Sequence, residues 1–367
     1  MKFICSTNDI TSAIVNVHRS IPSKPEKPIL EGVLLQAVNG QVKITAYDES
    51  IGVVTSIPAK IVENGNAVIN GKIFADIIKS LSAEETFIEA DNETMYISNG
   101  LTDFTIIVMN AAEYPELPLF EVLASSKIES KTLKSMISQT AYAISENKNK
   151  PVYTGSLFSF KDNELTIVAI DGFRMAVRRE KIESSQKNSI IVPGKAQHEI
   201  IRLLTDEKEH VEIKIGQRHV IFLIGKYTLI SRLIEGEFLD YNASIPKSFS
   251  AEVIVNSRMI TESVERMSIL NNEKVQTPVV CKMLKNEIKL SCQSSTGRAK
   301  DVVEAINSGE ELEAGFNIRY LFEALKNIDT DEIKLMMNNA HTPLLIKPVN
   351  GESFLYLVLP MIYSANL

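Results

Sequence analysis

The sequence is poor in cysteine and histidine, and neither residue occurs at spacings that would build a metal site. Its three cysteines stand far apart without a CxxC pair, which argues against a disulfide framework and against a zinc site. We expect them to be buried apolar thiols in a reducing compartment. The five histidines show no metal-ligand spacing either. We therefore predict neither a bound metal nor a cofactor.

Long apolar runs and catalytic motifs are also missing. No apolar stretch approaches the length that spans a bilayer, and the first six residues lack a signal core and predict a strand, so we expect a cytoplasmic protein. There is no nucleophile elbow, phosphate-cradling glycine-rich loop, HExxH motif or paired-carboxylate motif. An enzyme stays open as a rival interpretation, with Asp171 and Arg174, or His341, as an acid–base group. Loss of turnover in an Asp171→Asn variant would favour it.

The chain does contain one sequence pattern that occurs three times. Each copy is an apolar run that opens at a proline and passes through a polar turn. The runs open at Pro28, at Pro151 (123 residues later) and at Pro278 (127 residues further on), with turns at Asn39-Gly40, Asp162-Asn163 and Asn286. A period this long indicates a repeated domain rather than a solenoid unit. The length accommodates three domains, which we predict at residues 1–124, 125–248 and 249–367.

Within each repeat, the spacing of apolar residues predicts two helices and several strands. The predicted helices are 7–21, 71–81, 131–145, 194–204, 257–270 and 317–327. The predicted strand pairs are 32–38 with 41–46, 155–160 with 164–169 and 279–284 with 287–292. This order predicts an α+β fold with two helices packed on antiparallel sheets in each domain, and linkers near 119–127 and 246–251.

The net charge is −7, but the charges are unevenly distributed. The six predicted helices hold eleven basic and six acidic residues, which leaves a net −12 on the rest of the chain. The second helix of each repeat has cations seven residues apart, almost two turns, with an acid between them: Lys72-Asp76-Lys79, Lys195-Glu199-Arg202 and Arg319-Glu323-Lys326. Ion pairs on a solvated face would also give this pattern. Three copies in register favour a basic surface that faces phosphates weakly and without reading bases.

Local strings then identify a family resemblance. The segment VAIDGFRMAV at 168–177 resembles VATDGHRLA of the bacterial sliding clamp, the beta subunit of replicative DNA polymerase III. The string LNNEK at 270–274 resembles the family's LSNEK, and LVLPM at 357–361 resembles its VMPM tail. Together with the threefold repeat, the resemblance covers the whole chain.

The resemblance implies a non-catalytic processivity factor in which two copies close head to tail into a ring of six domains. Twelve helices would line a hole for duplex DNA, which the ring would encircle without sequence preference. Expected partners are duplex DNA, a second copy of the chain, the replicative polymerase, the clamp loader and other clamp-motif proteins, with no membrane. A scaffold that binds proteins but not DNA stays open as a second rival, in which the basic helices are merely solvated.

The resemblance also assigns residues. A partner-peptide pocket between the second and third repeats would comprise Tyr153, Ile170, Gly172, Phe173, Arg174, Met175, Leu239, Pro343, Leu359, Pro360 and Met361. Together with the helix cations, it implies DNA contacts at Lys24, Lys72, Lys79, Asn147, Lys148, Lys150, Lys195 and Arg202. The dimer interface would join Phe104 and Ile106 of one chain to Ile269 and Leu270 of the other.

Several positions depart from the family pattern. Phe173 and Ile170 stand where histidine and threonine are frequent, so we expect a more apolar pocket. The family often ends in Met-Arg-Leu, whereas here six further residues follow Met361, which should shift the preference for partner motifs. Pro151 and Val152 replace aromatic DNA contacts, for which Lys148 and Lys150 would compensate electrostatically.

Overall fold

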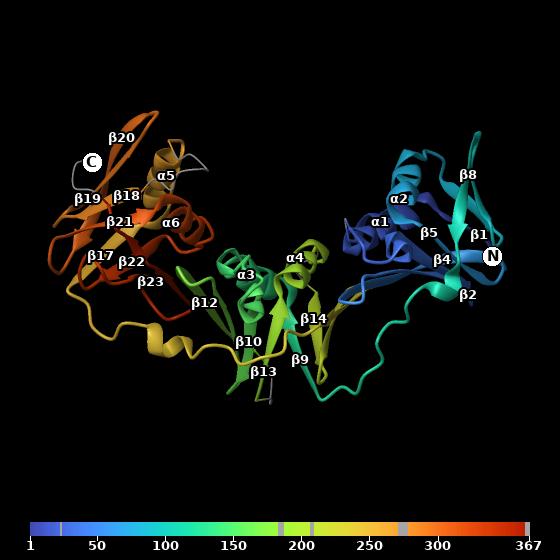
Figure 1. Cartoon of the computed structure of the whole chain (residues 1–367), viewed down its shortest axis with the longest axis horizontal. Helices are drawn as coiled ribbons and strands as arrows, with labels where there is room; N and C mark the ends of the chain where they lie inside the picture. The colour runs from blue at the N-terminus through green and yellow to red at the C-terminus, as the bar shows by residue number, and fades with distance from the viewer. Residues whose placement is uncertain (23, 183–186, 206–208, 271–277, 364–367) are drawn as a thin grey trace. The chain divides into compact units, whose positions relative to one another are not determined.

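The structure is a computed structural model that describes residues 1–22, 24–182, 187–205, 209–270 and 278–363. These residues form six α-helices and two large sheets in which all the strand pairs are antiparallel (Figure 1). The helices are α1 (Thr7–Val17), α2 (Gly71–Ser80), α3 (Ser130–Ser138), α4 (Gly194–Leu203), α5 (Ser257–Ser268) and α6 (Ile318–Leu325). The α+β expectation is confirmed. In the described part of the chain, every helix is too short or too polar to cross a membrane.

One compact unit comprises residues 1–134 and 195–233 and contains a 12-stranded sheet. Helix α1 contacts α2 and lies against the sheet, where Ile10, Ile14 and Phe74 are fully buried. In sheet order the strands are β1 (Lys2–Ser6), β6 (Glu85–Ala90), β7 (Thr94–Asn99), β8 (Thr102–Met109), β5 (Gly65–Asn70), β2 (Gly32–Val38), β3 (Gln41–Tyr47), β4 (Ile51–Glu63), β16 (Tyr227–Arg232), β15 (His219–Ile224), β14 (His210–Ile215) and β9 (Ala124–Glu129).

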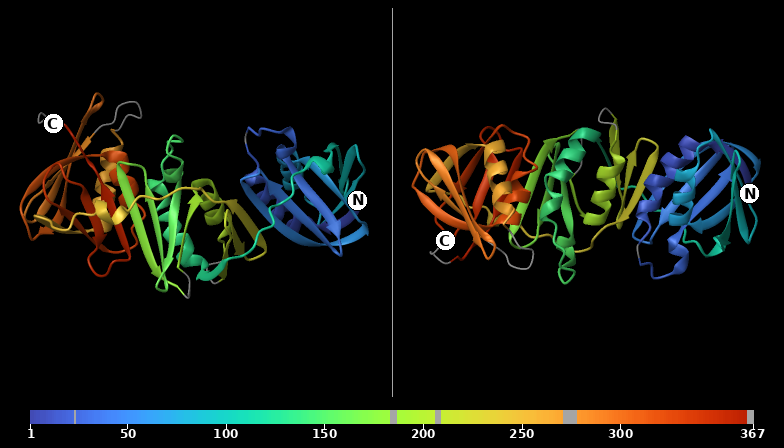
Figure 2. Two further views of the ribbon diagram at one scale, coloured as in Figure 1. Left: turned by 60° about the horizontal axis from the view of Figure 1, so that its bottom comes forward. Right: turned by 90° about the horizontal axis from the view of Figure 1, so that it is seen from above.

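The other compact unit comprises residues 135–194 and 234–367 and contains a 13-stranded sheet. Helices α5 and α6 contact each other over one face, and the connecting segment 234–250 crosses the sheet on its other side (Figure 2). In sheet order the strands are β13 (Asn188–Pro193), β10 (Gly155–Lys161), β11 (Glu164–Ile170), β12 (Arg174–Lys181), β24 (Phe354–Val358), β23 (Leu344–Pro348), β22 (Glu332–Met337), β17 (Ala251–Asn256), β20 (Gly297–Asn307), β19 (Glu287–Ser294), β18 (Pro278–Met283), β21 (Leu312–Asn317) and β25 (Pro360–Met361).

Two compact units arise from three sequence repeats because strands pair across repeats. Strand β4 of the first repeat pairs with β16 of the second, which extends the first sheet. Strand β12 of the second repeat pairs with β24 of the third, which extends the second sheet. The second repeat therefore contributes to both units, as its residues 125–134 and 195–233 belong to one and 135–194 to the other.

The predicted hairpins form at the predicted turns. Asn39 and Gly40 both have positive φ (52° and 75°), as do Asp162 and Asn163 (54° and 61°). Positive φ at both central residues defines the type I′ turn, whose twist matches that of the flanking strands, and Asn, Asp and Gly tolerate it best. The third predicted pair also forms, as β18 and β19, with Leu284 N–H donating to the carbonyl of Glu287 across the loop.

Four helices begin at a polar side chain that ends the preceding strand. Ser6 accepts a hydrogen bond from the backbone of Asp9 at the start of α1. At the starts of α2, α5 and α6, an asparagine side chain likewise accepts a hydrogen bond from a backbone N–H: Asn70, Asn256 and Asn317. Such N-caps satisfy backbone N–H groups that have no intrahelical partner, and each contributes about 1 kcal/mol. The repeat thus includes the local signal that converts strand into helix.

Three predicted boundaries are wrong. The helix predicted at 131–145 ends at Ser138. Just beyond its end, the Thr140 hydroxyl donates a hydrogen bond to the Met136 carbonyl (2.8 Å), and the Thr140 N–H donates to the Ile137 carbonyl. Such side-chain bonding competes with the helix. The helix predicted at 7–21 ends at Val17 and continues as a 3₁₀ turn, His18–Ser20. The linker predicted at 119–127 is strand from Ala124 onward, because β9 pairs with β14.

The three cysteines are buried and free, as predicted. Burial raises the pKa of the Cys5 and Cys281 thiols to about 12, so neither is a thiolate near neutral pH. Residues 271–274 of the LNNEK string and 364–367 of the tail lie outside the described residues.

Candidate functional site

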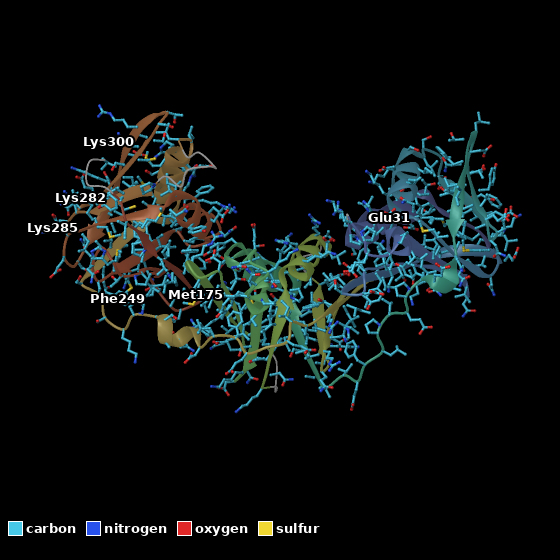
Figure 3. The ribbon with its side chains drawn as sticks, in the orientation of Figure 1. Glu31, Met175, Phe249, Lys282, Lys285 and Lys300 are labelled. Carbon is cyan, nitrogen blue, oxygen red and sulfur yellow. The ribbon has the colours of Figure 1, made fainter. Side chains whose placement is uncertain are left out.

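The predicted pocket residues gather on the face of the second sheet that is opposite helices α5 and α6. Ile170 on β11 and Met175 on β12 are buried there and belong to one apolar cluster. Leu359, just after β24, packs against this cluster. Figure 3 shows Met175 at this position on β12. Alternate residues of a strand point to opposite faces, which is why Ile170 and Met175 share one face while Ala169 and Ala176 face the helices.

A tight turn from Asp171 to Arg174 shapes the centre of the site. The Asp171 carboxylate accepts hydrogen bonds from the backbone N–H groups of Phe173 (2.8 Å) and Arg174 (3.0 Å). Gly172 has φ +98°, a conformation that disfavours any side chain there. The carbonyl of Phe173 accepts from the N–H of Leu359 (2.9 Å), which ties the turn to the C-terminal segment. The Phe173 ring is left 58% exposed.

The connecting segment after the second repeat forms a second wall. Phe238, Tyr241 and Ile245 pack against the apolar cluster, while Leu239 between them is 46% exposed. Tyr153 reaches the cluster through an edge-to-face contact with Phe238 (centroids 5.8 Å apart). Pro343 directly precedes β23, whose first residue pairs with Val358, and Pro360 and Met361 form the short β25 beside β21. The result is an apolar surface with two exposed large side chains at its rim.

Arg174 is placed differently from the other predicted pocket residues. Its side chain points to the helix-bearing face, because it alternates with Met175 along β12. There its Nε donates to Asp171 Oδ2 (2.8 Å) and its Nη1 donates to Glu323 of α6. The guanidinium lies over the rings of Tyr320 (4.4 Å) and Tyr142 (5.3 Å). Arg174 thus contributes its backbone to the pocket, and its side chain holds β12 to α6.

The pocket rim and this charged cluster share an aromatic contact. The Phe173 ring stacks on Tyr320, with centroids 6.0 Å apart. Glu323 also accepts from Arg319 (3.1 Å), so one carboxylate holds two arginines. Burial would raise the pKa of Glu323, but hydrogen bonds and charge from Arg174 and Arg319 outweigh it and leave the pKa below its usual value. The cluster therefore depends on an ionised Glu323.

This dependence predicts an acid-labile junction. Because the folded-state pKa of Glu323 is lowered, its contribution to stability is present above pH 4.5, its ordinary value, and is lost as the pH falls through the folded value. The urea midpoint should fall between about pH 5 and about pH 3 by more in the wild type than in a Glu323→Gln variant. Equal declines in the two proteins would show that Glu323 is not the titrating group.

The predicted DNA-contacting cations fall into two groups. Lys79 lies 3.7 Å from Asp76, Arg202 pairs with Glu199 (2.8 Å), and Lys195 pairs with Asp48 rather than with Glu199 four residues on. These three are partly neutralised, as the ion-pair interpretation of the helix pattern expects. The remaining cations are exposed, and no carboxylate of the described residues lies within 4 Å of them: Lys24, Lys72, Lys148 and Lys150. Asn147 caps the loop that holds the last two, accepting from the N–H of Asn149 (3.0 Å).

Two of the predicted interface residues lie on a strand with an open edge, and the other two follow helix α5. Residues 102–107 of β8 pair only with β7 within the described chain, and residues 297–304 of β20 pair only with β19. Phe104 and Ile106 are half-buried on β8, and Ile107 beside them is exposed. Ile269, at the end of α5, is 79% exposed, and Leu270 packs partly against the core.

The rival acid–base groups have structural roles. Asp171 and Arg174 are joined in the ion pair described above, and the exposed His341 lies in a turn in which its N–H donates to Asn339 (2.9 Å). Among the described residues, no three His, Cys, Asp or Glu side chains are grouped to hold a metal ion.

Comparisons with known proteins decide the family. Three family models match consecutive parts of the chain: the DNA polymerase III beta subunit N-terminal domain at 1–118, central domain at 127–240 and C-terminal domain at 243–362. The beta sliding clamp of Bacillus subtilis is 30% identical over 98% of this chain and 99% of its own length. The chain belongs to the beta sliding clamp family.

Solved sliding clamps share the fold of this clamp. A crystal structure from Bacillus subtilis superposes with a TM-score of 0.95 at 28% identity, covering 99% of this chain and 100% of the other. A putative DNA polymerase III beta subunit from Eubacterium rectale gives 0.94 at 30% identity, covering 98% and 99%. The family resemblance expected from the sequence is therefore confirmed over nearly the whole length, and the enzyme interpretation is set aside because the family is a non-catalytic processivity factor.

Sequence reasoning missed several residues of the clamp's candidate pocket. Phe238, Tyr241 and Ile245 form its second wall, and Tyr320 with Glu323 fixes Arg174 behind it. One signal was available: GEFLDY at 236–241 repeats the pattern of AEYPEL at 112–117, 124 residues earlier. A repeated aromatic residue in two linkers indicates that both linkers pack onto their sheets.

Proposed function

We propose that this clamp is a cytoplasmic DNA polymerase processivity factor that acts as a head-to-tail homodimeric ring of six domains. The ring encircles duplex DNA and slides along it without sequence preference. It tethers the replicative polymerase, the clamp loader and other partners through the apolar pocket at Ile170, Met175 and Leu359. The domains are 1–124, 125–248 and 249–367.

The observation that carries the ring is the repeated strand junction. The strand after the first hairpin pairs with the last strand of the next repeat, as β4 with β16 and β12 with β24. The equivalent strand of the third repeat is β20, and the last strand of the first repeat is β8. Both have open edges within the described chain, and Ile107 and Val302 on them are exposed. Exposed apolar edge strands are a liability for a monomer, which pairing of β20 with β8 of a second copy would remove.

DNA contact is supported by the cations that have no carboxylate within 4 Å among the described residues. Lys24, Lys72, Lys148 and Lys150 are free to attract phosphates, whereas Lys79, Lys195 and Arg202 share their charge with acids. Affinity rises with the number of neutralised phosphates, so a surface this sparse gives weak, salt-sensitive attraction that permits sliding. The ring closure, rather than the attraction, would then prevent escape.

Reversing these four lysines to glutamate is expected to reduce DNA synthesis by the cognate polymerase and loader at least roughly tenfold at about 0.15 M salt. The matched control reverses four exposed lysines outside the helices and outside β8 and β20: Lys161, Lys181, Lys282 and Lys285. The last two are labelled in Figure 3. The control makes the same change in net charge and should leave synthesis unchanged. Product length on a singly primed circle measures both. Equal activity of the two variants would support a protein scaffold instead.

The pocket proposal has a separate test. Phe173→Asp and Leu239→Asp place a charge on exposed rim positions, so folding should be preserved. Stimulation of the polymerase should fall at least roughly tenfold, because short motifs depend on a few apolar anchors. Both variants should remain dimeric in sedimentation velocity, because the pocket lies apart from the proposed β20–β8 junction. Unchanged stimulation would place the partner site elsewhere.

A further inference from the structure

A second groove lies in the first compact unit, on the outer face of the first repeat. It has a volume of about 450 Å³ and lies between strands β2 and β3 and the connecting segment that follows β8. Leu34, Tyr114 and Leu117 provide its apolar lining, and Leu119 at its margin is almost fully exposed. Figure 1 shows this connecting segment running along the sheet on the side away from α1 and α2. The groove is separate from the partner pocket, which lies entirely in the other unit.

The base of the groove holds a buried hydroxyl without a partner. Thr45 is 2% exposed, and its Oγ1 has no hydrogen-bond partner among the described residues. Its backbone is satisfied, since the Thr45 carbonyl accepts from the Tyr114 hydroxyl (3.3 Å), which in turn accepts from the N–H of Tyr47 (2.9 Å). An unpaired buried hydroxyl is costly and is rare in native proteins. Its oxygen is closed to solvent, so Thr45 is a polar residue in the floor of the groove and is not itself a contact for a ligand.

The wall beside Thr45 carries one cation, Lys43. Lys43 and Gln36 are cross-strand partners on β3 and β2, and both line the groove. No carboxylate of the described residues lies within 4 Å of the Lys43 ammonium. Glu116 lines the opposite, linker side and is exposed. The groove thus has one cation, one buried hydroxyl in its floor and an apolar wall, with the Glu116 carboxylate as an acceptor on the opposite side.

The groove occupies the repeat-equivalent position of the partner pocket. Leu34 and Thr45 correspond to Leu157 and Val168, 123 residues later, and Tyr114 corresponds to Phe238, 124 residues later. In the second repeat these three residues belong to the apolar cluster that forms the partner pocket. The first repeat therefore keeps the same architecture but replaces an apolar floor residue by threonine and adds Lys43 where the second repeat has Thr166.

We propose that this groove is a second docking site, for an extended acidic peptide segment. An aspartate or glutamate of the segment pairs with Lys43, and a leucine-type side chain packs on Leu34, Tyr114 and Leu117. Recognition by a few apolar and charge-assisted anchors is typical of linear-peptide grooves. The ring would then carry two kinds of peptide site, one apolar and one selective for acidic segments.

The test uses the full-length dimer with methyl-labelled Leu, Val and Thr residues and a capped synthetic tetrapeptide that alternates aspartate and leucine. Saturable shifts are expected at Leu34, Thr45 and Leu117. Lys43→Glu should abolish them, whereas Thr45→Val should leave the affinity unchanged, because the Thr45 hydroxyl is closed to solvent. Thr45→Val reproduces the residue of the second repeat, so it should fold, and its thermal midpoint should match or exceed that of the wild type.

The controls separate this site from the partner pocket. Phe173→Asp should leave the shifts at Leu34 and Thr45 unchanged. The lysine–leucine version of the peptide should not produce them. The proposal is overturned if the acidic peptide shifts only Leu157 and Val168, if the basic peptide binds equally well, or if Lys43→Glu has no effect. Displacement by a single-stranded oligonucleotide at equal concentration would overturn it in favour of a nucleic-acid site.

Discussion

Replacing Ile269 by aspartate is expected to convert the dimer into folded monomers. Ile269 is 79% exposed in the single chain, so the change leaves the monomer fold intact. At the proposed junction its carboxylate would be taken out of water, and the apolar contact would be lost. Together these cost roughly 3 kcal/mol or more at each junction. A closed dimer has two junctions, so its dissociation constant should rise at least roughly a thousandfold.

Sedimentation velocity over a dilution series measures this dissociation directly. The matched control is Val62→Asp, which introduces the same charge at another exposed apolar residue, near the end of β4. The control should remain dimeric at concentrations where Ile269→Asp is monomeric. A dimer of unchanged affinity in Ile269→Asp would exclude the end of α5 from the interface.

Replacing Arg174 by methionine is expected to destabilise the second compact unit by about 3–5 kcal/mol. Arg174 is buried and neutralises Asp171 and Glu323, so its loss leaves two partly buried carboxylates without their cation. The contacts with Tyr320 and Tyr142 are lost as well. Because Phe173 stacks on Tyr320, the pocket rim should also lose its support, and affinity for a polymerase-derived peptide should fall roughly tenfold.

Urea denaturation compares this variant with Lys181→Met, which removes an exposed cation from the same strand and should cost less than about 0.5 kcal/mol. Adding Glu323→Gln to Arg174→Met should recover part of the loss, because it removes a partly buried carboxylate that keeps only the exposed Arg319 as a partner. If Arg174→Met is as stable as Lys181→Met, the cluster does not hold β12 to α6.

The sequence predicted the features that depend on local chemistry. The two type I′ hairpins formed where Asn, Asp and Gly marked them, because these residues tolerate positive φ. The spacing of the cations along the helices was also predicted, but their ion-pair partners were not. Lys195, for example, pairs with Asp48, which is 147 residues away in the sequence. Such a partner depends on the assembled sheet, and no helical periodicity reveals it. The same holds for the end of α3, where one threonine hydroxyl competes with the helix.

In the candidate site, too, local features could be predicted from the sequence and contacts between distant segments could not. The string around Asp171 predicted a partner pocket by resemblance, and this stays a prediction. Strand alternation could have placed Arg174 on the opposite face from Met175. Of the residues that hold Arg174, Tyr142 belongs to the same repeat, whereas Tyr320 and Glu323 belong to the third. All three meet Arg174 only in the folded protein. The groove at Thr45 could not be predicted from the sequence for a similar reason. A buried hydroxyl without a hydrogen-bond partner can be recognised only when the neighbouring side chains are known.

The most direct measurement loads the dimer onto a nicked circular duplex with a cognate clamp loader, washes the complex at high salt and then linearises the circle. A closed annulus around DNA should survive the wash and leave only after linearisation, and Ile269→Asp should not be retained at all. Release of the wild type during the wash, with the circle still intact, would contradict encirclement and leave only an electrostatic binder.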